Sequence, residues 1–485
     1  MNRINQGING LRPVGHLGAM NIGIYAVFLC LIGVALYVFP HPIMLLAVGL
    51  VPFAIWGIVR FSFYVVLAFV VFSFFRIHEV FPVLSPLKLP QLLALGALFV
   101  IFLRLTILQS LAPFWSRQFT LLIAFFLLVS LSMPLAANFG VAMKSWSGTY
   151  SKVVLMTLVI AWMMREEEHF VSACRVYLIA GGCVGIVALL NKANGIGLVE
   201  GTRVTIGRDI GSLLGDPNDL ALVLLYPIAF AISTFFEKGC SRFERFLGAA
   251  VFFILVFAIL ATQSRGGLLG LVAVVGLFAY NRVKSKVLLG IAGSIGLILL
   301  FAVAGISERS SGGAAEEGID ASAMGRLYAW EAAWNMALDN PIWGVGLSNF
   351  YYNYFFYSAH WDGLNHAVHS TWFGVLAETG FVGLGIFIAL IVTTFIASWR
   401  LLTSGKLDNL APGVRIAINA APAGVAGFII SGTFLTQGFI WPIYLQVALV
   451  IALKKFCEKR WATEDKETSQ FYLQNAKSKL KQPKC

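Results

Sequence analysis

Hydrophobic residues fill most of this chain in long uninterrupted runs, and short polar segments separate them. Most runs approach the roughly 20 residues that an α-helix needs to cross the hydrocarbon core of a bilayer. They lie near residues 22–39, 42–59, 61–77, 91–107, 118–136, 150–164, 170–190, 217–235, 246–263, 265–280, 286–305, 372–398, 414–434 and 438–455. The pattern predicts an all-α polytopic membrane protein with fourteen candidate helices, or twelve if the two runs that meet at Arg60 form a re-entrant hairpin.

The composition supports this class and excludes a soluble protein. Hydrophobic residues make up 59% of the chain and aromatic residues 14%, whereas charged residues make up only 12%. The formal net charge is +12, but the basic residues lie between apolar runs and in the C-terminal tail, as the positive-inside rule requires. We therefore interpret the charge as a determinant of topology and expect membrane lipids, and no nucleic acid, as partners.

The distribution of charge also predicts a topology. With Arg3 and Arg12 on the cytoplasmic side, the positively charged turns and the tail fall on that side too. The expected organisation is a helical bundle over 1–305 with outer-side turns at 191–216 and 263–265, an outer loop over 306–370 with an amphipathic helix, C-terminal transmembrane helices over 371–455, and a basic cytoplasmic tail over 456–485.

Several kinds of chemistry have no motif in the sequence. No phosphate-binding loop, dinucleotide fingerprint or zinc-type cysteine spacing is present. We therefore expect no cofactor and no bound metal, and we look for function in polar residues on the outer side of the membrane.

The first such group lies in "EGTRVTIGRDIGSLLGDPNDLALVLLYP", residues 200 to 227. Arg203 and Arg208 stand in a glycine-rich outer loop, where arginine runs against the topological bias and where its planar fork suits phosphate oxygens. They are candidate diphosphate ligands, although solvated loop arginines would look the same. The Gly-Asp-Pro-Asn turn that includes Asn218 is typical of an ordinary helix start near Asp219 or Leu220.

The second group is the turn "QSRGG", where Arg265 lies between two apolar runs. A charge so close to hydrocarbon is costly unless it has a partner or reaches the interface, so Arg265 is a functional candidate. The glycines that follow it let another backbone or a ligand approach closely.

The long outer loop predicts a helix over Met324–Asp339, with Leu327, Trp330 and Trp334 on one apolar face and Glu331 opposite. Such a helix is expected to lie on the membrane or to cap the bundle. The aromatic segment 349–361 that follows is typical of an interfacial belt, and stacking on sugar rings is the alternative.

The segment "HAVHSTWFGVLAETGFVG", residues 366 to 383, places two histidines at the start of an apolar run. On a continuous helix His366 and His369 would lie near each other and Glu378 would lie on the opposite face, which argues against a metal site on one helix. A histidine on the water side of a helix start is suited to accept a proton from a hydroxyl group near neutral pH.

Taken together, these groups indicate a transfer reaction. Arginines from two outer turns and a histidine from a third would offer cations for an anionic leaving group and a base for an incoming hydroxyl. We therefore expect transfer of a sugar from a lipid diphosphate, with His369 as the base.

The same motifs resemble the O-antigen ligase and O-antigen polymerase superfamily of bacterial membrane glycosyltransferases. The pattern of His, then Asn, Ser or Gln, nine residues, Gly, two residues and Gly is satisfied by His369, Ser370, Gly380 and Gly383. "GRDIGSLLGDPNDLA" is similar to the family's Arg-x-x-Gly followed by Pro-Asn-x-Leu-Ala, which maps the first essential arginine onto Arg208 rather than Arg203.

Two further segments extend the resemblance. "QSRGGLLG" is similar to the family's Ser-Arg-Gly turn and maps the second arginine onto Arg265. The stretch from Gly325 to Phe350 is similar to the start of the family's large periplasmic loop, with Arg326 and Trp330 at familiar places. The supporting residues that we expect at the site are Arg326, His366, Ser370 and Asn218.

The resemblance implies a GT-C-type fold and metal-independent, inverting transfer from an undecaprenyl-diphosphate-linked glycan. It also implies a bacterial inner-membrane protein with cytoplasmic termini and a periplasmic active site. The acceptor stays open: a ligase uses lipid A core, a polymerase another lipid-linked repeat unit, and some relatives a protein side chain. We favour a polymerase of O-antigen or exopolysaccharide type, because nothing in the loops points to lipid A core.

A glycolipid flippase or exporter is the alternative from a different class. It would also need outer arginines for a diphosphate, but it predicts basic residues along a path through the membrane. Arg104 and Arg175, the main other candidates, are interpreted as cytoplasmic helix ends.

Overall fold

The computed structural model describes Gly33, Leu50 and residues 53–303 and 321–480. The chain divides into two units, Met1–Ser62 and Phe63–Cys485. In the first unit the helix Phe53–Arg60 ends just before α3 begins at Ser62. Nearly all of the predicted run 22–39, the first part of the run 42–59 and the start of the long loop lie outside the described residues.

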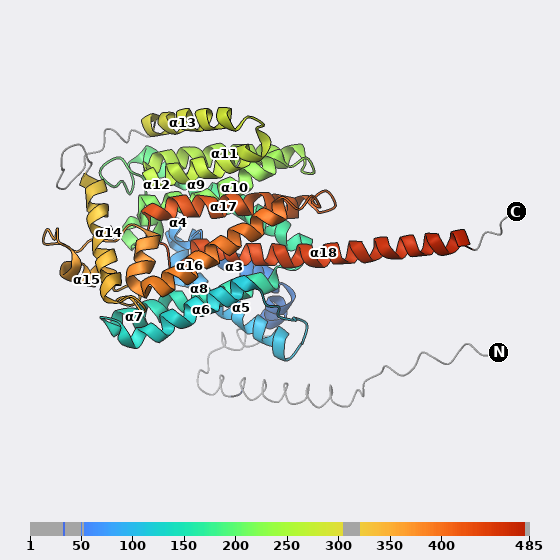
Figure 1. The fold of residues 1–485 in the computed structure, drawn as a ribbon, viewed down its shortest axis with the longest axis horizontal. Helices are drawn as coiled ribbons and strands as arrows, with labels where there is room; N and C mark the ends of the chain where they lie inside the picture. Colours follow the sequence, from blue (N-terminus) through green and yellow to red (C-terminus); the bar gives the residue numbers. More distant parts are fainter. Residues whose placement is uncertain (1–32, 34–49, 51–52, 304–320, 481–485) are drawn as a thin grey trace. The chain divides into compact units, whose positions relative to one another are not determined.

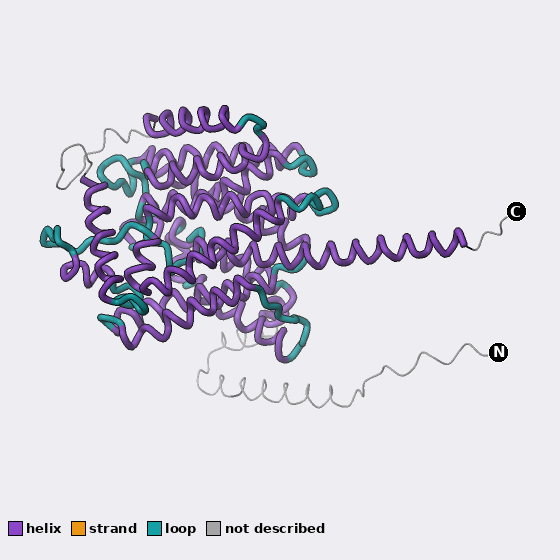
Figure 2. Tube along the Cα trace, in the orientation of Figure 1, coloured by secondary structure: helices purple, strands orange, loops and turns teal. Residues whose placement is uncertain are grey.

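The described part of the chain is helical and contains no strand. The helices are α3 (Ser62–Ser73), α4 (Ile77–Val80), α5 (Leu89–Thr106), α6 (Arg117–Ser132), α7 (Phe139–Ser145), α8 (Ser151–Met163), α9 (Glu167–Asn194), α10 (Pro217–Phe236), α11 (Arg242–Thr262), α12 (Arg265–Arg282), α13 (Lys286–Val303), α14 (Ala321–Asp339), α15 (Phe350–Tyr357), α16 (Thr371–Leu402), α17 (Pro412–Ser431) and α18 (Trp441–Leu480). Figure 2 shows how loops connect these helices, and α7 continues into α8 through a π-helical turn at Trp146–Tyr150.

The all-α membrane class predicted from the apolar runs is confirmed. Among the described residues, seven helices are long and apolar enough to cross a membrane, or up to eight if the pair that breaks at Phe61 forms one span. The count of twelve to fourteen spans stays a prediction, because part of the chain lies outside the described residues. The predicted boundary at residue 455 does not coincide with a helix end, since α18 continues to Leu480.

Helix α10 forms the centre of the second unit. Nearly all of its residues are buried, and it packs against α9, α11, α12 and α17. Close packing with α12 depends on small residues, because a Cβ at Gly267 would lie 2.5 Å from the Cβ of Ala221 and one at Gly270 would lie 2.5 Å from Leu225. Gly270 and Gly267 therefore let the N-terminal half of α12 approach α10 closely.

Three helices begin with a side-chain cap at one end of the bundle, which we call the site end. Asp216 caps α10, Ser264 caps α12 and Ser370 caps α16, each by accepting hydrogen bonds from backbone N–H groups of the first turn. Hydrogen bonds between these helix starts and their neighbours, described below, place them together. Figure 1 shows α14 running across this end of the bundle, where it packs against α16.

The prediction of a helix over Met324–Asp339 agrees with α14 (Ala321–Asp339), and the structure adds which of its residues pack against the protein. The buried residues of α14 are alanines and methionines, Met324, Ala329, Ala332, Ala333, Met336 and Ala337, whereas Leu327 and Trp334 stay exposed. Small side chains let two helices approach closely, and in a membrane protein a large apolar side chain does not need to face the protein. Of the predicted apolar face, Trp330 donates a hydrogen bond to Val368 O and stacks on Phe373, and Trp334 makes an edge-to-face contact with Phe381 of α16.

Helix α16 is broken inside the motif that begins with His369. Gly380 has φ 68° and ψ −173°, and the loop before α15 fills the break. Phe381 N donates to Pro341 O at 2.8 Å, and Val345 N donates to Ala377 O at 2.8 Å. The break therefore joins the loop after α14 to α16 through backbone hydrogen bonds that a continuous helix would not offer.

Candidate functional site

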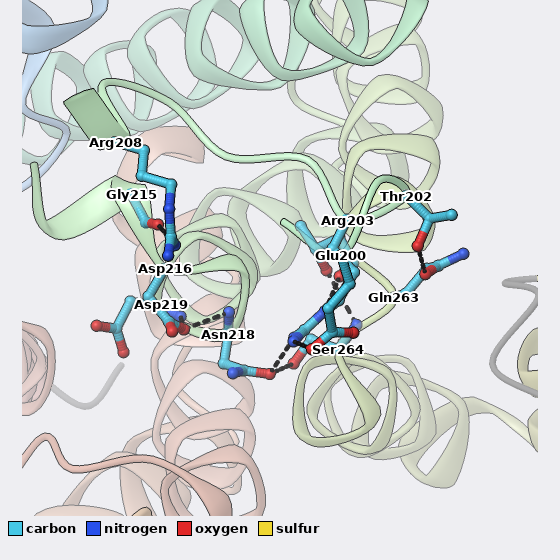
Figure 3. A network of polar contacts seen from close by, with 11 residues as sticks. Glu200, Thr202, Arg203, Arg208, Gly215, Asp216, Asn218, Asp219, Gln263 and Ser264 are labelled. Atoms are coloured by element: carbon cyan, nitrogen blue, oxygen red, sulfur yellow. Dashed lines mark hydrogen bonds and ion pairs between the residues drawn. The ribbon is translucent and has the colours of Figure 1, made fainter. Parts of the chain in front are cut away.

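The loop between α9 and α10 carries Arg203 into the protein. A short antiparallel bridge joins Val199 to Arg203, and Arg203 is only 6% exposed. Its Nη2 donates to Asn218 Oδ1 at 2.9 Å, and its Nε donates to Thr262 O at 3.2 Å. Arg203 thereby ties the loop both to the start of α10 and to the end of α11 (Figure 3).

Asn218 connects this loop to the turn that carries Arg265. Its Oδ1 also accepts a hydrogen bond from Ser264 Oγ at 2.9 Å. Ser264 is the N-cap of α12, and Arg265 is the first residue of that helix and is half-buried. One amide oxygen thus brings together the two predicted arginine segments, residues 200–227 and 263–267, which are separate in the sequence (Figure 3).

Arg208 occupies a different environment from Arg203. It begins a 3₁₀ turn after Gly207, it is exposed, and its Nη1 donates to Gly215 O at 3.1 Å. Gly215 is required there, because a Cβ on it would lie 2.9 Å from the Cα of Arg208. Of the two candidate arginines, Arg208 is therefore the one that is open to a ligand, and Arg203 is the one that the protein encloses.

Sequence reasoning missed a contact that holds the Arg208 turn. Ser212 Oγ donates to Glu79 Oε2, and Arg76 Nε donates to the same oxygen at 2.5 Å. Glu79 is buried and belongs to α4, which follows α3 in the chain. The charged residues that interrupt the apolar pattern near 76–79 were the available signal.

His369 stands immediately before α16 and not on it. Its φ of 46° is left-handed, and Ser370, the N-cap, accepts a hydrogen bond from Phe373 N at 3.4 Å. His366 and His369 therefore do not lie on one helix. His366 is instead paired with Asp362, with 2.9 Å between Nε2 and Oδ2, on the exposed part of the loop.

Helix α14 fixes the backbone next to His369. Trp330 Nε1 donates to Val368 O at 3.0 Å. Its ring also stacks on Phe373, with 5.1 Å between ring centroids and 12° between planes. Trp330 therefore holds the residues on both sides of His369, and α14 positions the histidine loop.

The surroundings of His369 favour its neutral form. Although the residue is exposed at its surface, desolvation by the surrounding protein lowers the pKa of the imidazole below its ordinary value, and the nearby charge of Arg326 lowers it further. Asp216 raises this pKa, while His366 and Arg203 lower it. A lowered pKa favours the neutral imidazole, which is the form that can accept a proton, and Arg326, Asp216 and Arg203 lie close enough to act on it electrostatically.

Glu378 serves a structural purpose in this arrangement. It is 7% exposed, and its Oε2 accepts a hydrogen bond from Ser348 N at 2.7 Å, in the turn before α15. Among the described residues, no group of three or more His, Cys, Asp or Glu side chains is arranged to hold a metal ion.

The structure thus brings Arg203, Asn218, Ser264, Arg326 and His369 to one end of the bundle, from segments that are far apart in the sequence. A comparison with protein families matches residues 250–388 to the family described as O-antigen ligase. The matched segment contains Arg265, Arg326 and His369, whereas Arg203 and Arg208 precede it. No curated protein matches the chain. Residues 250–388 are therefore a domain of the O-antigen ligase family, and the superfamily resemblance drawn from the motifs is confirmed.

Proposed function

We propose that this protein transfers a glycan from undecaprenyl diphosphate to a hydroxyl group at the periplasmic face of the bacterial inner membrane, as a polymerase of O-antigen or exopolysaccharide type. The observation that carries the proposal is the gathering of three helix starts at the site end: Trp330 holds the loop of His369 through Val368 O, and Asn218 joins Arg203 to Ser264, the residue before Arg265. The family of residues 250–388 supports a membrane glycosyltransferase of the ligase and polymerase type.

In the proposed reaction His369 accepts the proton of the acceptor hydroxyl as that oxygen attacks the anomeric carbon of the donor. The bond between this carbon and the diphosphate oxygen breaks, and the lipid diphosphate leaves with the electron pair. Attack from the face opposite the leaving group inverts the anomeric centre. The proton on His369 is then released to water.

Arg208 and Arg265 would bind the diphosphate as its charge increases. Both belong to turns at the site end, and Arg208 is exposed. Guanidinium groups donate two parallel hydrogen bonds to phosphate oxygens, which is why they replace a divalent cation in this proposal. Arg203 donates to Asn218 and to Thr262 O, so we assign it mainly to holding the two turns together.

The test is transfer by purified protein in detergent, with a lipid-diphosphate-linked oligosaccharide as donor and with two acceptors offered in parallel. The acceptors are further copies of the donor and a lipid A core. A ladder of lengthening glycans supports the polymerase, and a single shift of the core lipid replaces it with the ligase. Transfer to neither acceptor, from folded protein, contradicts the proposal and directs the search to protein acceptors.

The His369→Ala variant separates transfer from transport. We expect it to lose glycan transfer while the lipid-linked precursor still reaches the outer leaflet of cells. If the precursor no longer crosses the membrane, the chain acts as a flippase or exporter and the transferase assignment is wrong.

A further inference from the structure

The segment between α17 and α18 makes contacts at the site end that the proposed mechanism does not use. Thr371 Oγ1, at the first residue of α16, donates to Leu435 O at 2.6 Å and accepts from Gln437 N at 3.1 Å. Tyr444 in α18 donates its hydroxyl hydrogen to Gly438 O at 2.7 Å. Residues 435–438 are therefore fixed both to the start of α16, two residues from His369, and to α18.

The side chain of Gln437 reaches from this segment to a different helix. It is 2% exposed, and its Nε2 donates to Asp219 Oδ1 at 2.5 Å. Asp219 lies in the first turn of α10, next to Asn218. Figure 3 shows the Asp219 carboxylate and the Asn218 amide pointing to opposite sides of the start of α10. The first turn of α10 thus contacts the arginine turns on one side and the segment that holds α16 on the other.

We propose that Asp219 and Gln437 are positioning residues that set the placement of His369 relative to the diphosphate-binding arginines. The hydrogen bonds form a continuous path: Thr371 to Gln437, Gln437 to Asp219, and from α10 through Asn218 to Arg203 and to Ser264, the residue before Arg265. This inference rests on the proposed function, because it assigns the base and the anion site to the two ends of that path.

The placement matters because the base must meet the acceptor hydroxyl while the arginines hold the leaving group. An error of about 1 Å in such a geometry can cost on the order of 10²-fold in rate. Helices α10 and α16 each pack against α17, and Gln437 links their first turns at the level of the site: its backbone N–H donates to Thr371 Oγ1 and its side chain donates to Asp219. Loss of this bond should disturb the chemical step more than the binding of the donor.

The experiment compares variants of the full-length protein in transfer from a lipid-diphosphate-linked oligosaccharide, with kcat and the KM for this donor measured separately. For Gln437→Ala we expect kcat to fall by about tenfold or more and the KM to stay near that of the wild type. Asp219→Asn should stay close to wild type, because an amide oxygen at this position still accepts the hydrogen bond, and Asp219→Ala should behave like Gln437→Ala.

A rescue makes the test specific. Gln437→Glu places two carboxylates together and should lose activity, while the double variant D219N/Q437E again pairs one amide with one carboxylate and should recover it. Gln446→Ala is the matched control, because Gln446 is a glutamine of α18 that is 1% exposed and packs against Gly424 inside the bundle. The control should keep the wild-type kcat, and its elution in size-exclusion chromatography reports on folding.

Three results would overturn the inference while the wild type still transfers glycan: a wild-type kcat in Gln437→Ala, an Asp219→Asn variant as inactive as Asp219→Ala, or no recovery in D219N/Q437E. The second result would make the carboxylate itself a reacting group. Absence of transfer by the wild type would instead refute the proposed function, and this inference with it.

Discussion

Gly380 is the residue whose substitution best tests how the histidine motif folds. Its backbone angles of φ 68° and ψ −173° belong to a region that is essentially restricted to glycine. A Cβ at this position would lie 2.5 Å from Pro341 O and 2.8 Å from the carbonyl carbon of Ile342. Gly380→Ala therefore cannot be accommodated without a shift of the loop that fills the break in α16.

The expected cost follows from these two effects. The backbone conformation alone costs an alanine about 1–3 kcal/mol. A shift of the loop also weakens three hydrogen bonds, Phe381 N to Pro341 O, Val345 N to Ala377 O and Gly346 N to Glu378 O, each with a net value of about 0.5–1.5 kcal/mol. We expect Gly380→Ala to lower the free energy of unfolding by roughly 4 kcal/mol.

Equilibrium unfolding in mixtures of SDS and a mild detergent measures this change. Gly385→Ala is the matched control, because it lies in the same helix and no atom lies within 4 Å of an added Cβ. The control should change the free energy of unfolding by no more than about 1 kcal/mol. Equal stability of Gly380→Ala and the wild type, or an equal loss in Gly385→Ala, would refute the broken-helix account of the motif.

Further predictions concern the reaction. Because the pKa of His369 is lowered, the acidic limb of the pH–rate profile, where the imidazole becomes protonated, should have its midpoint below the ordinary histidine value of about 6.5. Arg326→Gln removes a charge that lowers this pKa, so it should move the acidic limb of the pH–rate profile to higher pH. Asp216→Asn removes a charge that raises this pKa but keeps a capping side chain, so it should move the limb to lower pH. If the two variants do not move the limb in these opposite directions, His369 is not the base. Arg265→Lys should lose nearly as much activity as Arg265→Ala, because a point charge does not replace a planar fork, and a near-normal Lys variant would argue against binding of the diphosphate. Activity should persist in EDTA, and a requirement for added Mg²⁺ or Mn²⁺ would refute the metal-independent reaction. Trp330→Phe keeps the stacking on Phe373 but loses the hydrogen bond to Val368 O, so its kcat should fall by a few-fold, and an unchanged kcat would show that α14 does not position His369 through this bond.

Many residues of the candidate site could be predicted from the sequence, because they interrupt the apolar pattern. Arg203, Arg208 and Arg265 stand out where a membrane protein disfavours arginine, and the helix start after Asp216 follows from capping chemistry. Such signals are local, and they identify single residues well. They do not say which of two arginines the protein encloses, because that depends on where Asn218 and Thr262 lie in space.

Two features of the site end could not be predicted from a single segment. The amphipathic pattern of α14 does not say which residues face the protein, because next to a bilayer burial in protein is not the only apolar environment. The apolar run after His369 does not say how the backbone enters the helix, whereas the structure shows a left-handed conformation at His369 and a helix that starts only after the Ser370 cap. Both features depend on contacts with other segments.

The sequence alone specified the class of the protein, because hydrophobic length and charge placement follow from the thickness and polarity of a bilayer, which act on every membrane chain in the same way. It also carried a resemblance to the O-antigen ligase family, through motifs whose spacing lies within single segments, and the family match over residues 250–388 supports it. The tertiary structure was needed to show which segments meet: Glu79 with Ser212, Trp330 with Val368, and Gln437 with Asp219. These partners are 133, 38 and 218 residues apart. A local sequence pattern predicts only whether each of these residues lies in a helix or a loop. Which buried polar groups form hydrogen bonds with one another depends on how the helices pack.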